Sequence, residues 1–289
     1  MMRILPCEDS AAAAEGCRRA LDISRTVARS LGETAVHATH DGFYTLEDGR
    51  RVNWSGQVAT ALAGRVSLPP GARLPAPPTP GIEETLVSVR NETTLMAARR
   101  FADRSIRCLA LNFANGVEPG GGFLSGARAQ EEAICRSSAL YATLLGDPMY
   151  TSHRARPLPD SSDWIILSKD VPVFRTDAGE PLAEPWITDF ATCAAPYAPT
   201  VGQARSGELM ESRIRRLLEV ARAYEYEALV LGAWGCGAFQ NDPHRVASIL
   251  RAALTGEFDG CFREVVFAIT DWSPERRFLA PFRDIFAAS

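Results

Sequence analysis

Two adjacent glutamates, Glu131 and Glu132, follow a run of three glycines, Gly120, Gly121 and Gly122, in the segment NFANGVEPGGGFLSGARAQEE. Because glycine has no side chain to shield the backbone, the N–H groups of this run can come close to a bulky anion. The glutamates open a helical pattern shortly after the glycines, which puts two carboxylates beside that anion. This combination predicts the capture of a phosphate next to acid chemistry.

A second glycine-rich loop, GAWGCGAFQND, lies far downstream at residues 232–242. Its N–H groups stand between an apolar strand and a helical pattern, where the helix dipole favours an anion. The order GxxGxG differs from the dinucleotide-binding fingerprint GxGxxG, and the absence of GK[ST] from the sequence excludes a P-loop. A tight turn without a ligand explains this loop alone equally well. Paired with the glycine run, the loop favours a diphosphate ligand.

The glutamates have the chemistry that cleavage of a glycosidic bond requires, because an acid must protonate the leaving oxygen. Consecutive residues point about 100° apart on a helix, so Glu131 and Glu132 cannot flank one bond. We therefore expect one of them to bind and orient the substrate while the other transfers the proton. Two solvated glutamates in a first helical turn are the ordinary alternative when no glycine run is present.

Other reactive side chains are weaker candidates. A thiolate of Cys236 at a helix N-terminus would be activated, but only His244 lies near it in the sequence, so we do not expect cysteine catalysis. His37 and His40 lack further ligands nearby, and a surface turn explains them better than a metal site does. Asp271 follows the last strand and either faces the ligand or caps the closing helix. We expect neither metal nor cofactor.

The paired motif resembles the signature of poly(ADP-ribose) glycohydrolases, three glycines followed after a short spacer by Gln-Glu-Glu. The spacer 123–129 has the length typical of that family, and residues 86–286 resemble its compact bacterial-type branch. The resemblance implies an α/β fold, a macrodomain-like mixed β-sheet sandwiched between helices, with an N-terminal helical extension.

The resemblance also implies a role for individual residues. Glu132 would be the catalytic proton donor, Glu131 would contact ribose hydroxyls, and Gln130 would brace both. Asn115, in preference to Asn112, would bind the ribose beside the scissile bond. A phenylalanine packs on the terminal ribose in similar proteins, which is the expected role of Phe239 here; ordinary core packing is its alternative. The expected substrate-binding residues are Asn115, Gly120, Gly121, Gly122, Gln130, Gly235, Cys236, Gly237, Ala238 and Phe239.

The function that the resemblance implies is hydrolysis of the ribose–ribose bonds of poly(ADP-ribose), which releases ADP-ribose. ADP-ribosylated proteins would be the partners, and the reaction would reverse ADP-ribosylation in the DNA damage response. One rival is a non-catalytic macrodomain that binds terminal ADP-ribose; another is an enzyme acting on mono-ADP-ribosylated side chains. The glycine loops fit a reader and a catalyst alike, so only Gln130-Glu131-Glu132 separates these two.

The composition is that of an ordinary globular protein, with 289 residues of which 46% are hydrophobic and 23% are charged. A net charge of −4 gives no broad basic field, so duplex nucleic acid is not an expected partner. No apolar run reaches the ~18–20 residues that span a bilayer. Seven cysteines without a CxxC pair favour a reducing cytoplasm.

The elements that must position the candidate residues are predicted on both sides of a proline-rich linker. Six prolines within residues 68–81 exclude a helix and favour an extended chain. We place a domain boundary there, between an N-terminal extension at 1–80 and a catalytic domain at 81–289. The extension is predicted to hold a helix over 10–31 and a hairpin over 43–52 that turns at Asp48-Gly49.

Beyond the linker, strands and helices alternate, which predicts a mixed sheet flanked by helices. The predicted strands are 85–89, 106–113, 164–167, 171–174, 186–192, 228–232 and 264–269. The predicted helices are 92–102, 131–145, 209–224, 244–254 and one from 274. Both glycine loops follow a buried strand, and ligands bind beyond the carboxyl ends of strands in such sheets. The two loops can therefore grip one elongated ligand from both sides.

Overall fold

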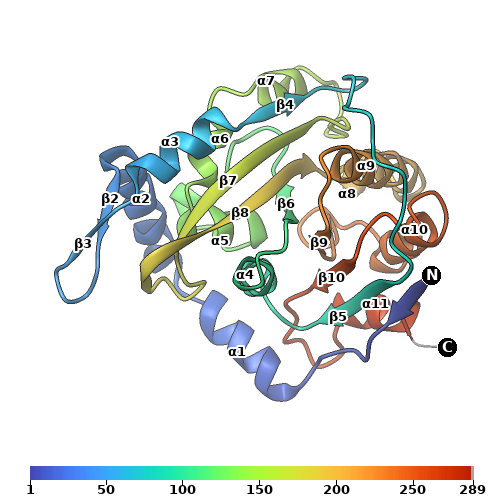
Figure 1. Ribbon diagram of the computed structural model, residues 1–289, viewed down its shortest axis with the longest axis horizontal. Coiled ribbons are helices and arrows are strands. Elements are labelled where there is room, and N and C mark those ends of the chain that lie inside the picture. The colour runs from blue at the N-terminus through green and yellow to red at the C-terminus, as the bar shows by residue number, and fades with distance from the viewer. Residues whose placement is uncertain (288–289) are drawn as a thin grey trace.

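An eight-stranded mixed sheet forms the centre of the molecule and carries helices on both of its faces (Figure 1). The computed structural model describes residues 1–287 of the chain. The strand order across the sheet is β1-β5-β10-β9-β6-β8-β7-β4, and a separate hairpin pairs β2 with β3. The strands are β1 Met2–Ile4, β2 Phe43–Thr45, β3 Arg51–Asn53, β4 Val66–Leu68, β5 Thr85–Arg90, β6 Cys108–Ala114, β7 Ile165–Arg175, β8 Pro181–Ala194, β9 Ala228–Leu231 and β10 Glu264–Ala268.

Across the sheet, each pair of neighbours in the series β1-β5-β10-β9-β6-β8 is parallel. At the other side, β7 pairs antiparallel with β8, and β4 pairs antiparallel with β7. β6 and β9 lie side by side in the middle, and their apolar side chains are buried on both faces. That burial explains the nearly continuous apolar runs of these two strands. Both glycine loops leave the sheet from the carboxyl ends of these central strands.

The two faces of the sheet hold separate hydrophobic clusters, because side chains alternate along a strand. Leu109 and Leu111 of β6 point into the cluster beneath α9, α10 and α11, whereas Ala110 points to the cluster beneath α2 to α6. The helices are α1 Ala11–Leu21, α2 Arg25–Asp41, α3 Ser55–Ala63, α4 Thr94–Asp103, α5 Gln130–Ser137, α6 Leu140–Leu144, α7 Pro148–Arg154, α8 Ala198–Val201, α9 Gln203–Ala223, α10 Pro243–Thr255 and α11 Leu279–Ile285. The expected sandwich of helices about a mixed sheet is present.

The N-terminal region is built into the sheet and does not form a separate extension, which corrects the boundary predicted at residue 80. β1 pairs with β5 at one edge, and β4 pairs with β7 at the other. The proline-rich segment is extended, as expected, and runs along α9, where Arg216 donates to the carbonyl of Ala72 at 2.9 Å. Strands of three residues carry too short a pattern to be predicted.

Several local predictions also need correction. His37 and His40 lie within α2, which continues to Asp41, and not in a turn. The helix predicted over 131–145 is broken at Ser138, whose backbone is extended and bridges to Val173. The strands predicted at 164–167 and 171–174 form one strand, β7, interrupted by an irregularity between Ser168 and Val171. α3 was not predicted.

No helix within residues 1–287 is long and apolar enough to cross a membrane. The same residues contain no group of three or more histidine, cysteine, aspartate or glutamate side chains placed to hold a metal ion.

Candidate active site

A cavity of about 420 Å³ lies beyond the carboxyl ends of the central strands. Its walls come from the segments that follow β5, β6, β9 and β10, together with the start of α5. The lining includes Asn115, Gln130, Glu131, Glu132, Gly235, Gly237, Ala238 and Phe239. The sheet therefore brings two segments more than 100 residues apart to one cavity, as the strand pattern predicts.

Gln130 fixes the first turn of α5 against the neighbouring strand. Its side-chain N–H groups donate to the carbonyl of Leu111 at 2.7 Å and to the hydroxyl of Thr94 at 3.0 Å, and its oxygen accepts from the N–H of Phe113 at 2.9 Å. This side chain anchors the start of α5 to β6 and Thr94, and Ala129, the N-cap residue, supplies no side-chain hydrogen bond to the helix. These hydrogen bonds fix the position of the following two glutamates relative to β6.

Glu131 is enclosed by hydrogen-bond donors. Oε1 accepts from Asn112 Nδ2 at 3.2 Å, and Oε2 accepts from the N–H of Asn115 at 2.7 Å. Burial raises the pKa of the Glu131 carboxyl to about 8, against the opposing effect of the Asn115 N–H. Asn112, the residue that we considered the weaker ribose ligand, is fully buried and contacts Glu131 rather than the cavity.

The two carboxyl oxygens of Glu132 differ in their hydrogen bonds. Oε1 accepts from the N–H of Gly122 at 3.0 Å. Oε2 is buried and has no hydrogen-bond partner within the described chain. Glu132 lines the cavity, so an unpaired carboxyl oxygen belongs to a side chain of the cavity wall.

The glycine run serves the carboxylates more directly than it serves a diphosphate. The N–H of Gly122 is bonded to Glu132 and that of Gly121 to the carbonyl of Glu118. A Cβ atom on Gly121 would lie 2.5 Å from Glu132 Oε1 and 3.1 Å from Glu131 Oε2. The three glycines are absent from the cavity lining. The expectation that Gly120, Gly121 and Gly122 cradle the phosphates is thus corrected: glycine is needed here so that the backbone can approach the two carboxylates.

The second glycine loop has the free donors that the first lacks. Within residues 1–287, the backbone N–H groups of Gly235, Gly237, Ala238 and Phe239 have no hydrogen-bond partner, and all four residues line the cavity. Gly235 has φ of +74°, and a Cβ there would meet Ala195 at 2.6 Å, so only glycine fits. Successive backbone N–H groups without partners can bind an anion together.

Cys236 faces away from the cavity. Its N–H donates to the carbonyl of Ala233, its thiol contacts the carbonyl of Trp234, and burial raises the thiol pKa. The expectation that Cys236 binds substrate is corrected, since neither its backbone N–H nor its side chain is available to a ligand. The raised pKa also opposes a role as a nucleophile.

Asn115 and Phe239 line the cavity from the two loops. The Asn115 side-chain oxygen accepts from the N–H groups of Val117 and Glu118, which leaves Nδ2 for a ligand. Phe239 is half-buried and packs edge-on against Tyr197, with ring centroids 5.9 Å apart. Phe239 packs against the core cluster and also lines the cavity, unlike an ordinary core aromatic.

The comparisons with known proteins agree with this geometry. The family model described as "Microbial-type PARG, catalytic domain" matches residues 32–176. The structure is similar to poly(ADP-ribose) glycohydrolase from Thermomonospora curvata, with 38% identity, 90% of this chain and 99% of that chain covered, and a TM-score of 0.83. The chain belongs to the microbial-type poly(ADP-ribose) glycohydrolase family. The family, the macrodomain-like fold class and the enzyme class predicted from the sequence, a glycosidase, are confirmed.

Two ligand complexes of similar glycohydrolases bear on the cavity. The T. curvata protein bound to the inhibitor ADP-HPD is 39% identical, with 90% of this chain and 99% of that chain covered and a TM-score of 0.81. The Deinococcus radiodurans protein in complex with ADP-ribose is 37% identical, with 81% and 98% covered and a TM-score of 0.71. No curated protein matches the chain.

The cavity of this glycohydrolase also contains residues that sequence reasoning missed. Glu92 and Thr93 follow β5, Asp177 lies in the turn between β7 and β8, and Trp272 and Phe278 follow β10. Asp177 is buried and accepts from the hydroxyl of Thr93 at 2.5 Å. Only their positions after strand ends signalled them, and no local motif marks them.

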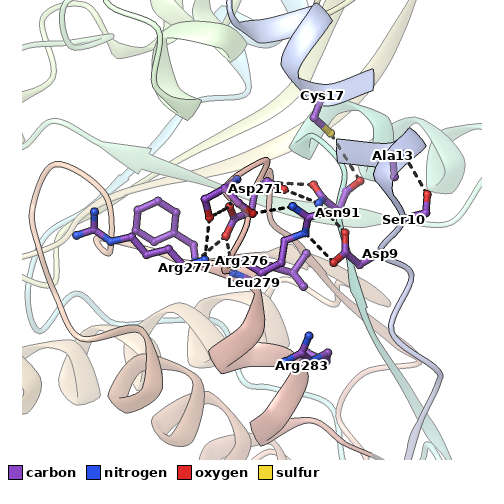
Figure 2. Close-up of polar contacts among 12 residues, drawn as sticks. Asp9, Ser10, Ala13, Cys17, Asn91, Asp271, Arg276, Arg277, Leu279 and Arg283 are labelled. Carbon is purple, nitrogen blue, oxygen red and sulfur yellow. Dashed lines mark hydrogen bonds and ion pairs between the residues drawn. The ribbon is translucent and has the colours of Figure 1, made fainter. Parts of the chain in front are cut away.

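A polar junction holds the segment after β10 in place (Figure 2). Asn91 donates to Asp9 at 2.9 Å and to the carbonyl of Asp271 at 2.6 Å, and it accepts from the N–H of Asp271 at 3.0 Å. The Asp271 carboxylate accepts from the N–H groups of Phe278 and Leu279, so it caps the turn before α11 and does not face the ligand. The junction thereby positions Trp272 and Phe278 at the cavity.

Arg136 adds a buried positive charge one turn along α5 from Glu132. Its guanidinium nitrogens have no hydrogen-bond partner in the described residues. Burial lowers the pKa of Arg136, while Asp177 and Glu132 act in the opposite direction. The helix therefore holds a cation close to the carboxyl of Glu132.

Proposed function

We propose that this chain hydrolyses the ribose–ribose O-glycosidic bonds of poly(ADP-ribose) to release ADP-ribose, with Glu132 as the general acid. The observation that carries the proposal is the Glu132 carboxyl, which belongs to a side chain of the cavity wall, is anchored through Oε1 to Gly122, and leaves the buried Oε2 without a partner in the described residues. Glu131, whose two oxygens both accept hydrogen bonds, suits orientation of ribose hydroxyls rather than proton transfer. Family membership supports the reaction, and this asymmetry supports the division of roles.

In the proposed mechanism, the four free N–H groups of the second glycine loop bind the diphosphate. Phe239 packs on the terminal ribose, and Asn115 Nδ2 donates to a ribose hydroxyl. Glu132 gives its proton to the departing ribose oxygen as the bond to the anomeric carbon breaks, through an oxocarbenium-like transition state. Water then adds to the anomeric carbon, and its proton returns to the Glu132 carboxylate. The substrate diphosphate assists by stabilising the positive charge.

The experiment compares Glu132→Gln with the wild-type protein and with Glu33→Gln, a matched change at an exposed position of α2. Release of ADP-ribose from purified polymer should fall by ~1000-fold or more in Glu132→Gln, since general acid catalysis contributes ~100- to 10,000-fold. Binding of ADP-ribose, measured by calorimetry, should change little. Turnover by Glu132→Gln at the wild-type rate would refute the assignment.

The same experiment separates the catalyst from its rivals. A reader would bind ADP-ribose with the same affinity in all three proteins but release none from polymer. An enzyme for mono-ADP-ribosylated side chains would act on a singly modified protein and leave polymer intact. The free carboxyl oxygen of Glu132 favours the polymer glycohydrolase over the reader, because binding alone requires no unpaired buried acceptor.

ADP-ribosylated proteins are the partners in this proposal, and the reaction reverses ADP-ribosylation, including that made in the DNA damage response. A reducing cytoplasm is the proposed location. All seven cysteines are free thiols, which supports such a compartment.

A further inference from the structure

We propose that His153 of α7 is a positioning residue that locks the loop 115–118 and, through it, both Asn115 and Glu131. The proposal rests on the proposed function, because it assigns these two residues to substrate binding. His153 lies outside the cavity lining and is buried beneath the loop. It acts through main-chain atoms rather than by touching the substrate.

The partners of His153 fix one neutral tautomer. Nδ1 lies 3.0 Å from the carbonyl of Gly116, which can only accept, so Nδ1 carries the hydrogen. Nε2 lies 3.1 Å from the N–H of Ser162, which can only donate, so Nε2 carries the lone pair. The Ser162 hydroxyl, at 2.7 Å, adds a second contact to Nε2. The ring therefore bridges the loop after β6 to the segment that precedes β7.

The loop that His153 holds has little freedom of its own. A Cβ on Gly116 would lie 2.5 Å from Ser161 Oγ and 3.1 Å from Ala194 Cβ, so the loop is packed tightly against its neighbours. Arg154, the next residue of α7, donates to the carbonyl of Val117. Helix α7 thus grips two successive carbonyls of the loop.

This grip reaches the active site over a very short path. The N–H of Asn115 holds Glu131 Oε2 at 2.7 Å, and the Asn115 side chain is oriented by the N–H groups of Val117 and Glu118. A shift of Gly116 moves all of these atoms together, because they belong to adjacent residues. Loss of the His153 bridge therefore displaces both the Asn115 side chain, which would bind the ribose, and the Asn115 N–H, which donates to Glu131.

Protonation weakens the bridge on the Ser162 side. A second ring hydrogen on Nε2 can be accepted by the Ser162 hydroxyl, but it takes away the lone pair that accepts from the backbone N–H of Ser162. Burial lowers the pKa of His153 below its ordinary 6.5, so the ring is neutral at physiological pH. The charged groups around the ring are Arg213 of α9, Arg156 and Asp160 after α7, and the pair Arg154–Glu118 on the solvent side. Arg213 also braces the far segment by donating to the carbonyls of Asp160 and Ser162.

The test compares three variants. His153→Phe keeps the bulk and removes both hydrogen bonds; His153→Gln keeps a donor and an acceptor but does not titrate; His40→Gln is the control at an exposed position of α2. In His153→Phe, kcat/KM for polymer should fall at least ~10-fold, since small misplacements of positioning groups cost up to ~100-fold. His153→Gln should retain most of the rate at pH 7.5, and His40→Gln should match the wild type.

The pH profile distinguishes positioning from simple support of the fold. As pH falls into the acid range below the ordinary histidine pKa of 6.5, wild-type kcat/KM should drop with the protonation of His153, whereas this drop should be absent from His153→Gln. An unchanged acid limb in His153→Gln overturns the proposal, as does a folded His153→Phe with the wild-type rate. If His153→Phe does not fold, the profile of His153→Gln alone decides.

Hydrogen exchange separates this proposal from the proposed function. The N–H groups of Val117 and Glu118 should exchange faster in His153→Phe than in His153→Gln, whether or not the wild type cleaves polymer. A wild type without turnover would refute the proposed function and leave this measurement interpretable. Equal exchange at the two positions in both variants would refute the lock itself.

Discussion

Glu131 couples the stability of the protein to pH, because its carboxyl is buried beside a second acidic side chain, Glu132. The pKa rises from 4.5 to about 8, with burial as the main cause and Glu132 as a further one. Between these values the native state binds a proton that the unfolded chain has lost, so the free energy of unfolding decreases as pH rises. The stabilisation is complete below about pH 4.5 and is lost by about pH 8.

Glu131→Gln should remove this dependence. The free energy of unfolding, measured with urea from pH 4.5 to 8.5, should fall by roughly a few kcal/mol less in the variant than in the wild type. Asn112 can turn its amide so that its oxygen, which has no partner in the described residues, accepts from the new side-chain N–H. Parallel curves for the two proteins would contradict a raised pKa of Glu131.

Gly121→Ala tests whether the glycine run exists for the carboxylates. A Cβ at this position would lie 2.5 Å from Glu132 Oε1, and φ is +58°. We expect kcat to fall ~100-fold because the acid is displaced. Gly49→Ala, with φ of +84° and nothing within 4 Å of the new Cβ, is the matched control. It carries the backbone strain of about 1 kcal/mol without the clash, so its activity should equal that of the wild type.

At the scale of elements, the junction at Asn91 connects the first segment of the chain with the ends of β5 and β10 (Figure 2). Its side chain is buried and uses both its oxygen and its nitrogen. Asp9 is held in turn by Arg276 at 2.8 Å. The part of the cavity wall formed by Trp272 and Phe278 therefore depends on contacts of a residue that lies outside the cavity lining.

Asn91→Ala should destabilise the protein by roughly 2–4 kcal/mol, because three hydrogen bonds are lost and buried groups stay unpaired. Affinity for ADP-ribose should weaken as Trp272 and Phe278 lose their support. Asp9→Asn, which keeps a side-chain oxygen for Asn91, should have a smaller effect on both quantities. Thermal unfolding and calorimetric titration measure them. Equal effects of the two changes would argue against Asn91 as the centre of the junction.

The elements show why part of the site could be predicted from the sequence. Gln130, Glu131 and Glu132 share one helical turn beside a glycine run, so a local pattern revealed them. Asn112 and Asp177 act through the register of β6 and the turn after β7, and no local pattern encodes such contacts. Sequence spacing does not show where an N–H group points. It therefore predicts ligand binding for the glycine run and for Cys236, although the N–H groups of Gly121, Gly122 and Cys236 bond within the protein.

At the scale of the whole molecule, residues 1–80 and 81–287 contribute strands to one sheet. β1 and β4 supply its two edge strands (Figure 1), although both precede the proline-rich segment. Alternating strands and helices beyond residue 81 were predictable from apolar periodicity. Strands of three residues and the single turn of α8 are too short to show a period. The edge strands β1 and β4 therefore cannot be predicted from the sequence pattern.

We therefore expect one cooperative unfolding transition for the full chain. Circular dichroism and tryptophan fluorescence should report the same midpoint, since Trp54 in the N-terminal region and Trp234 in the second glycine loop belong to one structure. A fragment of residues 81–289 should not reach the native state, because unpaired edges at β5 and β7 favour aggregation. Two separate transitions would restore the domain boundary at residue 80.

The placement of β4 has a consequence for biosynthesis. Its partner β7 begins almost 100 residues later in the chain, at Ile165. During translation at about 5–20 residues per second, β4 must wait several seconds before the ribosome delivers that partner. The nascent N-terminal region thus spends this interval with an unsatisfied strand, and chaperones that shield exposed strands are what it would depend on.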